Sequence, residues 1–193
     1  MKIFKDKKKL IDEISKIKRI AFIPTMGFLH EGHLSLINKA KRESKNILVS
    51  IFVNPKQFNS KTDYIKYPRN ISRDIKILKK KKIQFLYIPD YKEIYSHKIK
   101  NKLYLDKFSR LLCGKYRPGH FKGVINVVNR FIEIIKPKTI YLGLKDFQQL
   151  TLIKQHILKN NINTKVVSCP IIRGKNGIVL SSRNFKLNNK QIK

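Results

Sequence analysis

The passage from an apolar run through a glycine-bearing loop into a helical pattern constrains the fold of this chain most. Residues 20–23 (Ile-Ala-Phe-Ile) are typical of a buried strand, and residues 34–40 carry apolar side chains on one side at helical spacing. Gly27 and Gly32 lie between them and let the main chain approach a ligand closely. Because the first N–H groups of a helix are free and carry the positive end of its dipole, this arrangement predicts a phosphate site.

Two imidazoles belong to the same loop. His30 and His33 can donate hydrogen bonds to phosphate oxygens or hold charge that develops on them. Histidines at this spacing are nevertheless more often surface or structural groups, and they would also suit a metal. Zinc requires further ligands, and Cys113 and Cys169 lie far away in the sequence with no matching spacing. The position after a strand, with glycines on either side, therefore favours a nucleotide phosphate.

Later parts of the chain alternate apolar runs with helical patterns, which is typical of a parallel sheet with right-handed crossovers. The run at residues 46–53 is almost continuous, as expected for a strand covered on both faces. We therefore predict an α/β fold, a Rossmann-like parallel sheet with helices on both faces. The other predicted strands are residues 83–88, 139–142 and 164–168; the predicted helices are residues 2–18, 73–81 with Ser72 as N-cap, 117–135 and 147–158; residues 89–104 are expected to be irregular, and residues 171–180 to form a small hairpin that turns at 175–177.

The net charge of +32 would ordinarily indicate a nucleic-acid partner, because clustered Lys and Arg release counterions from phosphate backbones. Here the excess is mostly lysine, it is spread along the chain, and no recognisable nucleic-acid motif accompanies it. We interpret the charge as a compositional bias with incidental attraction for anionic substrates, and we predict no specific nucleic-acid partner. A noncatalytic basic nucleic-acid binder is the alternative that would explain the charge alone.

Length and apolar pattern are those of a globular protein. At 193 residues the chain can form one α/β domain with a proper core, or one domain with a small appendage. No apolar run approaches the roughly 20 residues that span a bilayer, and the N-terminal lysines are not followed by the apolar core of a signal peptide. Two cysteines without a framework spacing fit a reducing compartment. We therefore expect a cytoplasmic protein with no membrane partner.

Polar residues follow the run at 46–53, at the end of a strand where ligands bind in open α/β sheets. The amide side chains of Asn54 and Gln57 suit the hydroxyl, amine and carboxylate groups of a small polar substrate. Standing alone, they would be better explained by strand capping and turn closure. Arg117, at a glycine-containing helix entrance, can hold an anion, although Arg-Pro-Gly by itself is only a turn.

Two later loops carry charged and hydroxyl side chains. Lys145 beside Asp146 suits phosphate neutralisation and Mg²⁺ binding, and the alternative is an exposed ion pair of little energetic worth. Ser181, Ser182 and Arg183 can hold a triphosphate and follow the charge on departing pyrophosphate, although Ser-Ser-Arg alone would carry no meaning.

In this order and spacing, the stretches resemble the pantoate–β-alanine ligase family of the H-x-G-H nucleotidyltransferase superfamily. The matching stretches are Pro-Thr-Met-Gly-Phe-Leu-His-Glu-Gly-His at 24–33, Phe-Val-Asn-Pro-Lys-Gln-Phe at 52–58, Arg-Pro-Gly-His-Phe-Lys-Gly-Val at 117–124, Gly-Leu-Lys-Asp-Phe-Gln-Gln at 143–149 and Leu-Ser-Ser-Arg-Asn at 180–184. The chain departs from the family pattern at Asn126, where Thr is usual, at Leu144, where Glu is usual, and at Gly174 and Asn176.

The resemblance implies a reaction and a set of site residues. ATP would adenylate (R)-pantoate with release of pyrophosphate, and β-alanine would then displace AMP to give pantothenate, with Mg²⁺ as the metal and a homodimer as the assembly. The implied catalytic residues are His30, His33 as the proton donor, Lys145 and Arg183. The implied ATP-binding residues are Met26, Gly27, Phe28, Leu29, His30, Glu31, Gly32, His33, Gly143, Leu144, Lys145, Asp146, Ile172, Leu180, Ser181, Ser182 and Arg183. Gln57, Gln149 and Asn54 would bind pantoate and β-alanine, and Asp74 would help to place Mg²⁺.

The resemblance also implies a domain organisation. Residues 1–184 would form the nucleotide- and pantoate-binding domain, and residues 185–193 would begin a C-terminal domain that is otherwise absent, in a fragment or in a naturally short enzyme. In the family that domain closes over the active site, so we expect adenylation to survive with weaker substrate binding. The alternative is another nucleotidyltransferase, such as a cytidylyltransferase. It would share the histidines but is not expected to have Asn54, Gln57 and residues 117–121 together.

Overall fold

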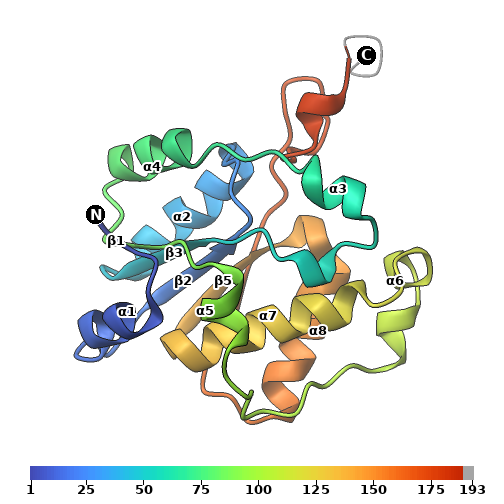
Figure 1. The fold of residues 1–193 in the computed structure, drawn as a ribbon. Helices are drawn as coiled ribbons and strands as arrows, with labels where there is room; N and C mark the ends of the chain where they lie inside the picture. Colours follow the sequence, from blue (N-terminus) through green and yellow to red (C-terminus); the bar gives the residue numbers. More distant parts are fainter. Residues whose placement is uncertain (189–193) are drawn as a thin grey trace.

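Six parallel strands form one sheet at the centre of the computed structural model, which describes residues 1–188 (Figure 1). The strands are β1 (Lys2–Phe4), β2 (Ala21–Thr25), β3 (Ile47–Ile51), β4 (Phe85–Tyr87), β5 (Thr139–Gly143) and β6 (Lys165–Cys169), in the spatial order β1-β4-β3-β2-β5-β6. Every pair of neighbouring strands runs parallel. The predicted fold class is confirmed.

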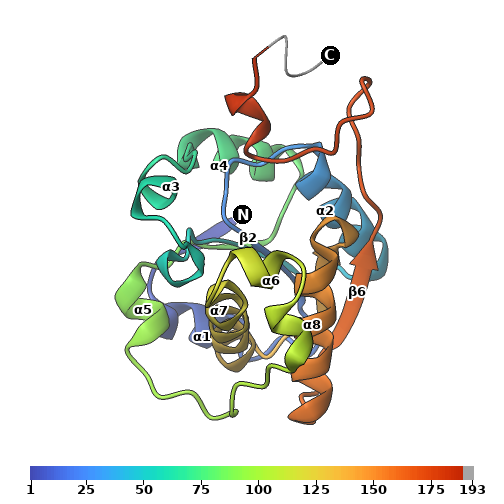
Figure 2. The same cartoon turned by 90° about the vertical axis from the view of Figure 1, so that its right-hand side faces the viewer.

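Helices cover both faces of the sheet (Figures 1 and 2). They are α1 (Lys7–Ile14), α2 (Glu31–Glu43), α3 (Lys61–Ile65), α4 (Ile71–Lys80), α5 (Tyr91–Tyr95), α6 (Cys113–Tyr116), α7 (His120–Ile135) and α8 (Phe147–Lys159), with short 3₁₀ turns at Pro55–Gln57, Lys107–Arg110, Leu144–Asp146 and Asn184–Lys186. Successive strand residues point to opposite faces. Phe22 and Leu48 pack with α1, α5, α7 and α8, whereas Ile23 and Val49 pack with α2 and α4. Burial on both faces explains the nearly continuous apolar runs.

The order of the strands places a crevice beside β2. From β2 the chain passes through α2 to β3 on one side, whereas β5 flanks β2 on the other side and follows α7 on the opposite face. The loops after β2 and β5 therefore leave the same edge of the sheet and diverge. In open α/β sheets this is where ligands bind, outside the carboxyl ends of the strands.

The N-terminal segment and the region after β4 differ from the predictions. The single helix predicted for residues 2–18 is wrong: residues 2–4 form β1 against β4, and Asp6 caps the shorter α1 through the N–H of Lys9 at 2.7 Å. A strand of this length is too short to show periodicity. The N-cap of α4 is Asn70 rather than Ser72. Residues 89–104 contain α5, with Asp90 as its N-cap, which the prediction missed.

The short helices α3 and α6 were also missed. The other predicted strands and helices agree with the structure to within three residues at each end. The predicted hairpin is a turn at residues 174–177 with one antiparallel bridge, between Arg173 and Val179. No helix of residues 1–188 is long and apolar enough to cross a membrane. Residues 189–193, which belong to the predicted start of a further domain, lie outside the described part of the chain, and the boundary at residue 184 stays a prediction.

Candidate functional site

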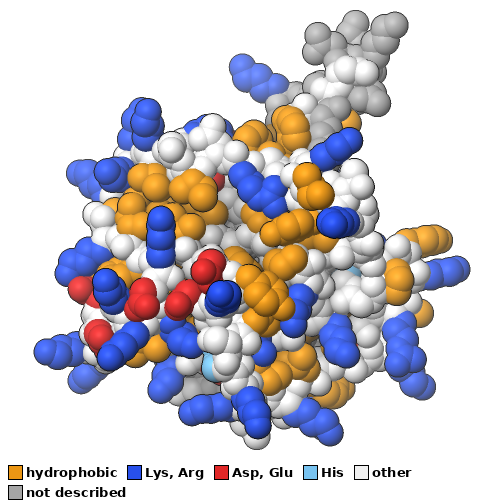
Figure 3. Space-filling model, viewed as in Figure 1, with side chains coloured by type: hydrophobic (Ala, Val, Ile, Leu, Met, Phe, Trp, Pro, Cys, Tyr) orange, Lys and Arg blue, Asp and Glu red, His pale blue; other side chains and the backbone are white. Residues whose placement is uncertain are grey.

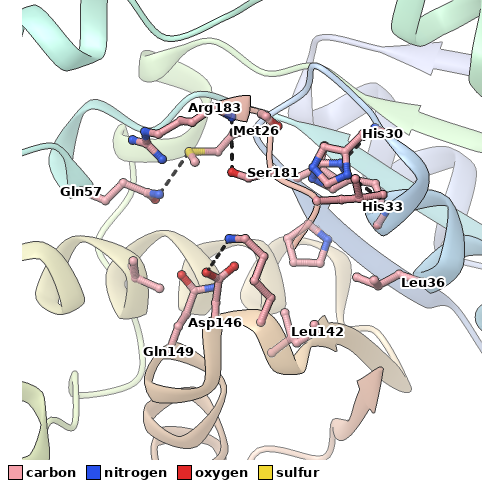
Figure 4. Close-up of a pocket in the computed structure, with 18 of the residues that line it drawn as sticks. Met26, His30, His33, Leu36, Gln57, Leu142, Asp146, Gln149, Ser181 and Arg183 are labelled. Carbon is pink, nitrogen blue, oxygen red and sulfur yellow. Dashed lines mark hydrogen bonds and ion pairs between the residues drawn. The ribbon is translucent and has the colours of Figure 1, made fainter. Parts of the chain in front are cut away.

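A cavity of about 240 Å³ lies beyond the carboxyl ends of β2 and β5 (Figure 4). Segments far apart in the sequence enclose it, including the loop after β2, the turn after β3, the start of α7, the loop after β5 and residues 170–183. The predicted site residues that line it are Met26, His30, Gly32, His33, Gln57, Gly143, Lys145, Asp146, Gln149, Ile172, Leu180, Ser181, Ser182 and Arg183. The fold thus brings together residues from every motif of the sequence analysis.

Some predicted site residues do not line the cavity: Gly27, Phe28, Leu29, Glu31, Asn54, Asp74 and Leu144. Two of these, Asn54 and Asp74, are completely or almost completely buried and instead hold cavity-forming segments in place. Leu144 is exposed at the surface of the loop after β5.

The histidine loop, residues 27–33, is fixed by a buried carboxylate from another helix. Gly27 has φ of +78° and Phe28 has φ of +52°, so two consecutive residues occupy the left-handed region. Asp74 of α4 accepts the N–H of Phe28 at 2.7 Å and the N–H of Leu29 at 2.8 Å, one on each carboxylate oxygen. These bonds hold a backbone conformation that would otherwise be strained. Asp74 is therefore a positioning residue for the loop.

Electrostatics around Asp74 favour this arrangement only in part. Burial raises the pKa of the Asp74 carboxyl, and the hydrogen bonds from Leu29 and Phe28 oppose that rise. Arg73 lies 3.8 Å from the carboxylate, donates to the carbonyl of Leu29 at 3.0 Å and covers the ring of Phe28 at 5.3 Å. Helix α4 thus holds the loop through one acidic and one basic side chain.

His30 and His33 cap the helix whose N-terminus they form. The N–H of Gly32 donates to Nδ1 of His30 at 3.1 Å, and the N–H of His30 donates to Nδ1 of His33 at 3.3 Å. Because both Nδ1 atoms accept, each neutral ring carries its hydrogen on Nε2, the nitrogen left available as a donor. A Cβ on Gly32 would lie 2.8 Å from the His30 ring, so glycine leaves room for this packing.

Burial keeps both imidazoles neutral. Desolvation, then His30 and Lys145, lower the pKa of His33 to about 3. Desolvation, then Lys145 and Arg73, lower the pKa of His30 below its ordinary value. At neutral pH the site therefore presents two uncharged Nε2–H donors at the N-terminus of α2, beside the positive end of the helix dipole. This combination suits phosphate oxygens.

Gln57 lies at the other end of the cavity from the histidines (Figure 4). Its side chain is oriented on both sides: Nε2 lies 3.1 Å from Sδ of Met26, and Oε1 accepts from Asn54 at 3.1 Å. Asn54 is in turn held by the carbonyl of Gly123 at 3.2 Å and the hydroxyl of Tyr95 at 2.8 Å. The side chain of Asn54 is therefore used to hold the surrounding structure. Of the two amides, Gln57 is the one that faces the cavity.

Three cations surround the cavity. Lys145 pairs with Asp146 at 3.0 Å, and both side chains line the cavity. The ion pair that the sequence offered as the alternative is thus present, and the ligand role of the two residues stays a prediction. Arg183 pairs with Asp63 of α3 at 2.8 Å. Arg117 is partly buried, and burial followed by the charge of Arg183 lowers its pKa, although a guanidinium stays protonated at neutral pH. The cavity thus has a positive field suited to anions.

The arm, residues 170–188, crosses the cavity between the histidine loop and α3. The hydroxyl of Ser182 donates to the carbonyl of Phe28 at 3.3 Å. The guanidinium of Arg183 lies 5.3 Å above the ring of Tyr67, and Phe185 packs on Phe28 with ring centroids 5.6 Å apart. These contacts place the predicted Ser-Ser-Arg segment over the site.

Sequence reasoning missed several residues that line the cavity. His120 lies inside the matching stretch at 117–124 without an assigned role, and Tyr67 lies in a segment interpreted only as a polar connection. The apolar wall is formed by Phe52, Val124, Val127, Val128, Phe131, Tyr141 and Leu142. Apolar positions of a buried helix look the same in sequence whether they face a core or a ligand, so only the fold separates them.

Metal ligands are few at this site. Within residues 1–188 no group of three or more His, Cys, Asp or Glu side chains could hold a metal ion. Asp146 is the carboxylate among the cavity-lining residues. Both oxygens of Asp74 face backbone N–H groups. A Mg²⁺ ion here would depend on phosphate oxygens for most of its ligands, as is common for this ion.

A doubly wound parallel sheet with a glycine-bearing loop, a helix N-terminus and cations at its switch point defines a Rossmann-like nucleotide-binding protein. The model of one family, described as Pantoate-beta-alanine ligase, matches residues 2–193. The chain belongs to this family.

Two pantothenate synthetases show how much of the chain is similar in sequence to its relatives. The pantothenate synthetase of Pseudothermotoga lettingae is 44% identical over 184 residues, which cover 95% of this chain and 66% of the relative. The pantothenate synthetase of Clostridium botulinum is 44% identical over 174 residues, which cover 90% of this chain and 62% of the relative. The chain thus spans about two thirds of the length of these relatives.

Solved structures agree with this assignment. The pantoate-beta-alanine ligase of Francisella tularensis, complexed with beta-gamma ATP and beta-alanine, superimposes with a TM-score of 0.94 at 43% identity and covers 100% of this chain and 75% of that one. The pantothenate synthetase of Thermus thermophilus gives a TM-score of 0.93 at 34% identity, with 98% and 69% covered.

Proposed function

We propose that this chain condenses (R)-pantoate with β-alanine at the expense of ATP, through a pantoyl-adenylate, and releases pyrophosphate and AMP. One observation carries the proposal: neutral imidazole donors and a rigid amide lie at opposite ends of one cationic, partly apolar cavity (Figure 4). A phosphate group fits the first end and a small hydroxy acid the second. The named relatives support the choice of substrates.

In the first step, the pantoate carboxylate attacks the α-phosphorus of ATP. The Nε2–H groups of His30 and His33 and the positive end of the α2 dipole stabilise the charge on the reacting phosphate. Lys145 and Arg183 balance the negative charge of the departing pyrophosphate. No enzyme nucleophile is required, so the rate depends on alignment and charge stabilisation.

Pantoate is aligned at the end of the cavity that carries the amide side chains. Gln57 and Gln149 both line the cavity and hold the hydroxyl and carboxylate of pantoate by hydrogen bonds. The adjoining wall of Val124, Val127 and Phe131 accepts its branched carbon skeleton. Because Asn54 locks Gln57, the amide does not need to reorganise when the substrate enters.

Mg²⁺ accompanies ATP in this proposal and would neutralise phosphate charge. Asp146 is the carboxylate placed to share it with the phosphates. Asp74, predicted to help place the ion, has both oxygens turned toward the histidine loop, so we assign it to the loop. We further propose a homodimer in the cytoplasm, on the family resemblance, to be tested by sedimentation and by fractionation of cells.

The spread of surface charge supports an enzyme of small anions over a nucleic-acid binder. On the face in Figure 3, Lys and Arg side chains project over the whole outline rather than along one stripe, and the few acidic side chains gather in one area. A nucleic-acid footprint would be a patch or a stripe. A salt-sensitive, specific complex with nucleic acid at nanomolar affinity would contradict this interpretation.

The test is pantoate-dependent exchange of labelled pyrophosphate into ATP, followed by addition of β-alanine and measurement of AMP and pantothenate. We expect exchange that requires pantoate, and product only after the amine is added. His33→Ala should abolish exchange, whereas Leu158→Ala, at a site 78% exposed on α8, should leave it unchanged. Exchange that prefers CTP would support the cytidylyltransferase alternative, and folded protein without any exchange would refute the proposal.

A further inference from the structure

His120 is the cavity histidine to which the mechanism above gives no task. It is the first residue of α7 and is 7% exposed. Its Nδ1 lies 2.7 Å from the backbone carbonyl of Gln57. A carbonyl oxygen can only accept, so Nδ1 carries the hydrogen and Nε2 of the neutral ring has a free lone pair.

This protonation pattern is the reverse of that in the histidine loop. His30 and His33 accept through Nδ1 and offer Nε2–H, whereas His120 donates through Nδ1 and offers an unprotonated Nε2. The ring stays neutral, since burial lowers the pKa of His120, Arg117 and Arg183 lower it further, and the hydrogen bond to Gln57 opposes them. The same cavity therefore holds two imidazole donors and one imidazole acceptor.

The Nε2 atom is open to the cavity. His120 lines it, none of the described residues forms a hydrogen bond to Nε2, and this atom is not among the buried polar atoms that lack a partner. Two other acceptors that line the cavity already have donors: Oε1 of Gln57 accepts from Asn54, and Asp146 accepts from Lys145. A group that must give up a proton beside Gln57 therefore meets the lone pair of His120.

We propose that Nε2 of His120 takes the proton that the ammonium group of the amine substrate loses before it attacks the acyl-adenylate. The proposal rests on the function proposed above, in which an amine that is protonated at neutral pH has to become a nucleophile. It makes His120 a catalytic residue of the second step only.

Atoms and electrons balance in this step. One N–H proton passes to Nε2, and the freed electron pair of nitrogen forms the C–N bond to the acyl carbon. The C–O bond to the phosphate of AMP then breaks, and its electrons leave with AMP. The second proton lost by nitrogen goes to the departing phosphate, and the imidazolium returns its proton to water when the product leaves.

The charges around the cavity make this transfer feasible. Arg117 and Arg183 disfavour a further positive charge, so they would lower the pKa of a bound ammonium as they lower that of the imidazole, and Asp146 opposes them in part. The position of His120 at the N-terminus of α7 also favours the neutral ring. The pKa of the bound ammonium is thus brought closer to that of the His120 imidazole.

Two variants separate proton removal from structure. His120→Asn places an amide N–H near the position of Nδ1, so the bond to the Gln57 carbonyl can persist while the base is lost. His120→Gln places an acceptor near the position of Nε2 that cannot take the proton. We expect both to retain acid-dependent pyrophosphate exchange and to lose about 10²-fold or more in β-alanine-dependent AMP release.

Hydroxylamine provides the decisive comparison, because it is largely unprotonated at neutral pH and traps acyl-adenylates as hydroxamates. Both variants should form hydroxamate at the wild-type rate. A normal β-alanine rate in His120→Asn would overturn the proposal, and so would a parallel loss with both amines or a loss of exchange. If the wild type shows no exchange, the proposed function fails and the base role fails with it. Nitrogen-15 NMR of the imidazole then still tests the predicted Nδ1–H form of His120.

Discussion

The histidine loop and the arm border the same cavity but are held in different ways. The loop is anchored by two short bonds to the buried Asp74 and by reciprocal capping of α2. The arm has one isolated bridge. It meets the rest of the site through one hydrogen bond from Ser182, the partly exposed pair of Arg183 with Asp63, and the ring contacts of Arg183 and Phe185.

The difference matches the tasks proposed for the two regions. Charge on a transferring phosphate is stabilised best by donors that are already in place, and the loop provides them. Departing pyrophosphate and entering substrates need groups that can follow them, and exposed side chains on an irregular segment allow that. Rigidity is therefore expected in the loop and not in the arm, and substitutions in both regions can test this.

Removing the anchor of the loop should have the largest effect. Asp74→Ala leaves the N–H groups of Phe28 and Leu29 without acceptors, one of them buried, and we expect the free energy of unfolding to fall by about 2–4 kcal/mol. Urea denaturation measures this. Exchange of pyrophosphate should fall as well, because His30 and His33 follow the displaced backbone.

A comparison with Mg²⁺ dependence separates anchoring from metal binding. If Asp74→Asn needs far more Mg²⁺ than the wild type but unfolds at the same urea concentration, Asp74 serves the metal rather than the loop. Unchanged Mg²⁺ dependence with reduced stability is the outcome expected here.

The next effect concerns two glycines with the same backbone conformation in different surroundings. Gly27 has φ of +78° and Gly177 in the arm has φ of +77°. A Cβ on Gly27 would lie 2.9 Å from Cγ2 of Ile51, whereas one on Gly177 meets nothing within 4 Å. We expect Gly27→Ala to cost about 2–3 kcal/mol and Gly177→Ala about 1 kcal/mol in urea denaturation. Equal losses would show that the loop is no more tightly packed than the arm.

Sequence patterns could predict five of the six strands of the described sheet, β2 to β6, because each of them lies in an apolar run. The sequence analysis did not predict the short β1 and α5. Strand β1 depends on pairing with β4, and α5 on a cap at Asp90, and neither interaction leaves a periodic pattern in the sequence. Long continuous elements carry their own signal, whereas short ones exist through tertiary contacts.

For the candidate site, as for the fold, the sequence indicated some of the residues but not the contacts between distant ones. Motif residues such as His30, His33 and Gln57 line the cavity, and their roles there stay predictions. The roles of Asp74 and Asp63 were not predictable, because each depends on a partner at least 45 residues away in the sequence. Resemblance identifies which residues recur in a family, and packing decides which of them touch the cavity.

Acid should act on the histidine loop rather than on the arm, since the loop holds His30 and His33 whereas the described arm contains no histidine. His33 binds a proton near pH 6.5 when unfolded but only near pH 3 when folded, so the unfolded state binds more protons between these values. Stability is therefore full above pH 6.5 and declines as the pH falls toward 3. We expect a loss of about 1–2 kcal/mol between pH 7 and pH 5 from this residue. His33→Gln should flatten the dependence measured by urea denaturation at each pH; an unchanged slope would contradict the assignment.

The smallest expected effect lies in the arm, at the pair of Arg183 and Asp63. Their side chains are 41% and 34% exposed, so Asp63→Asn should change the free energy of unfolding by less than about 1 kcal/mol. The change should nevertheless reach the ligand, because phosphate oxygens and Asp63 compete for the same guanidinium. Removing the competing charge should lower the KM for ATP by about 1.5- to 5-fold, the factor that corresponds to an exposed ion pair. High salt should remove the difference, since it screens the pair in the wild type as well. A raised KM would instead mean that Asp63 orients Arg183 for the ligand, and the arm would then be as preorganised as the histidine loop.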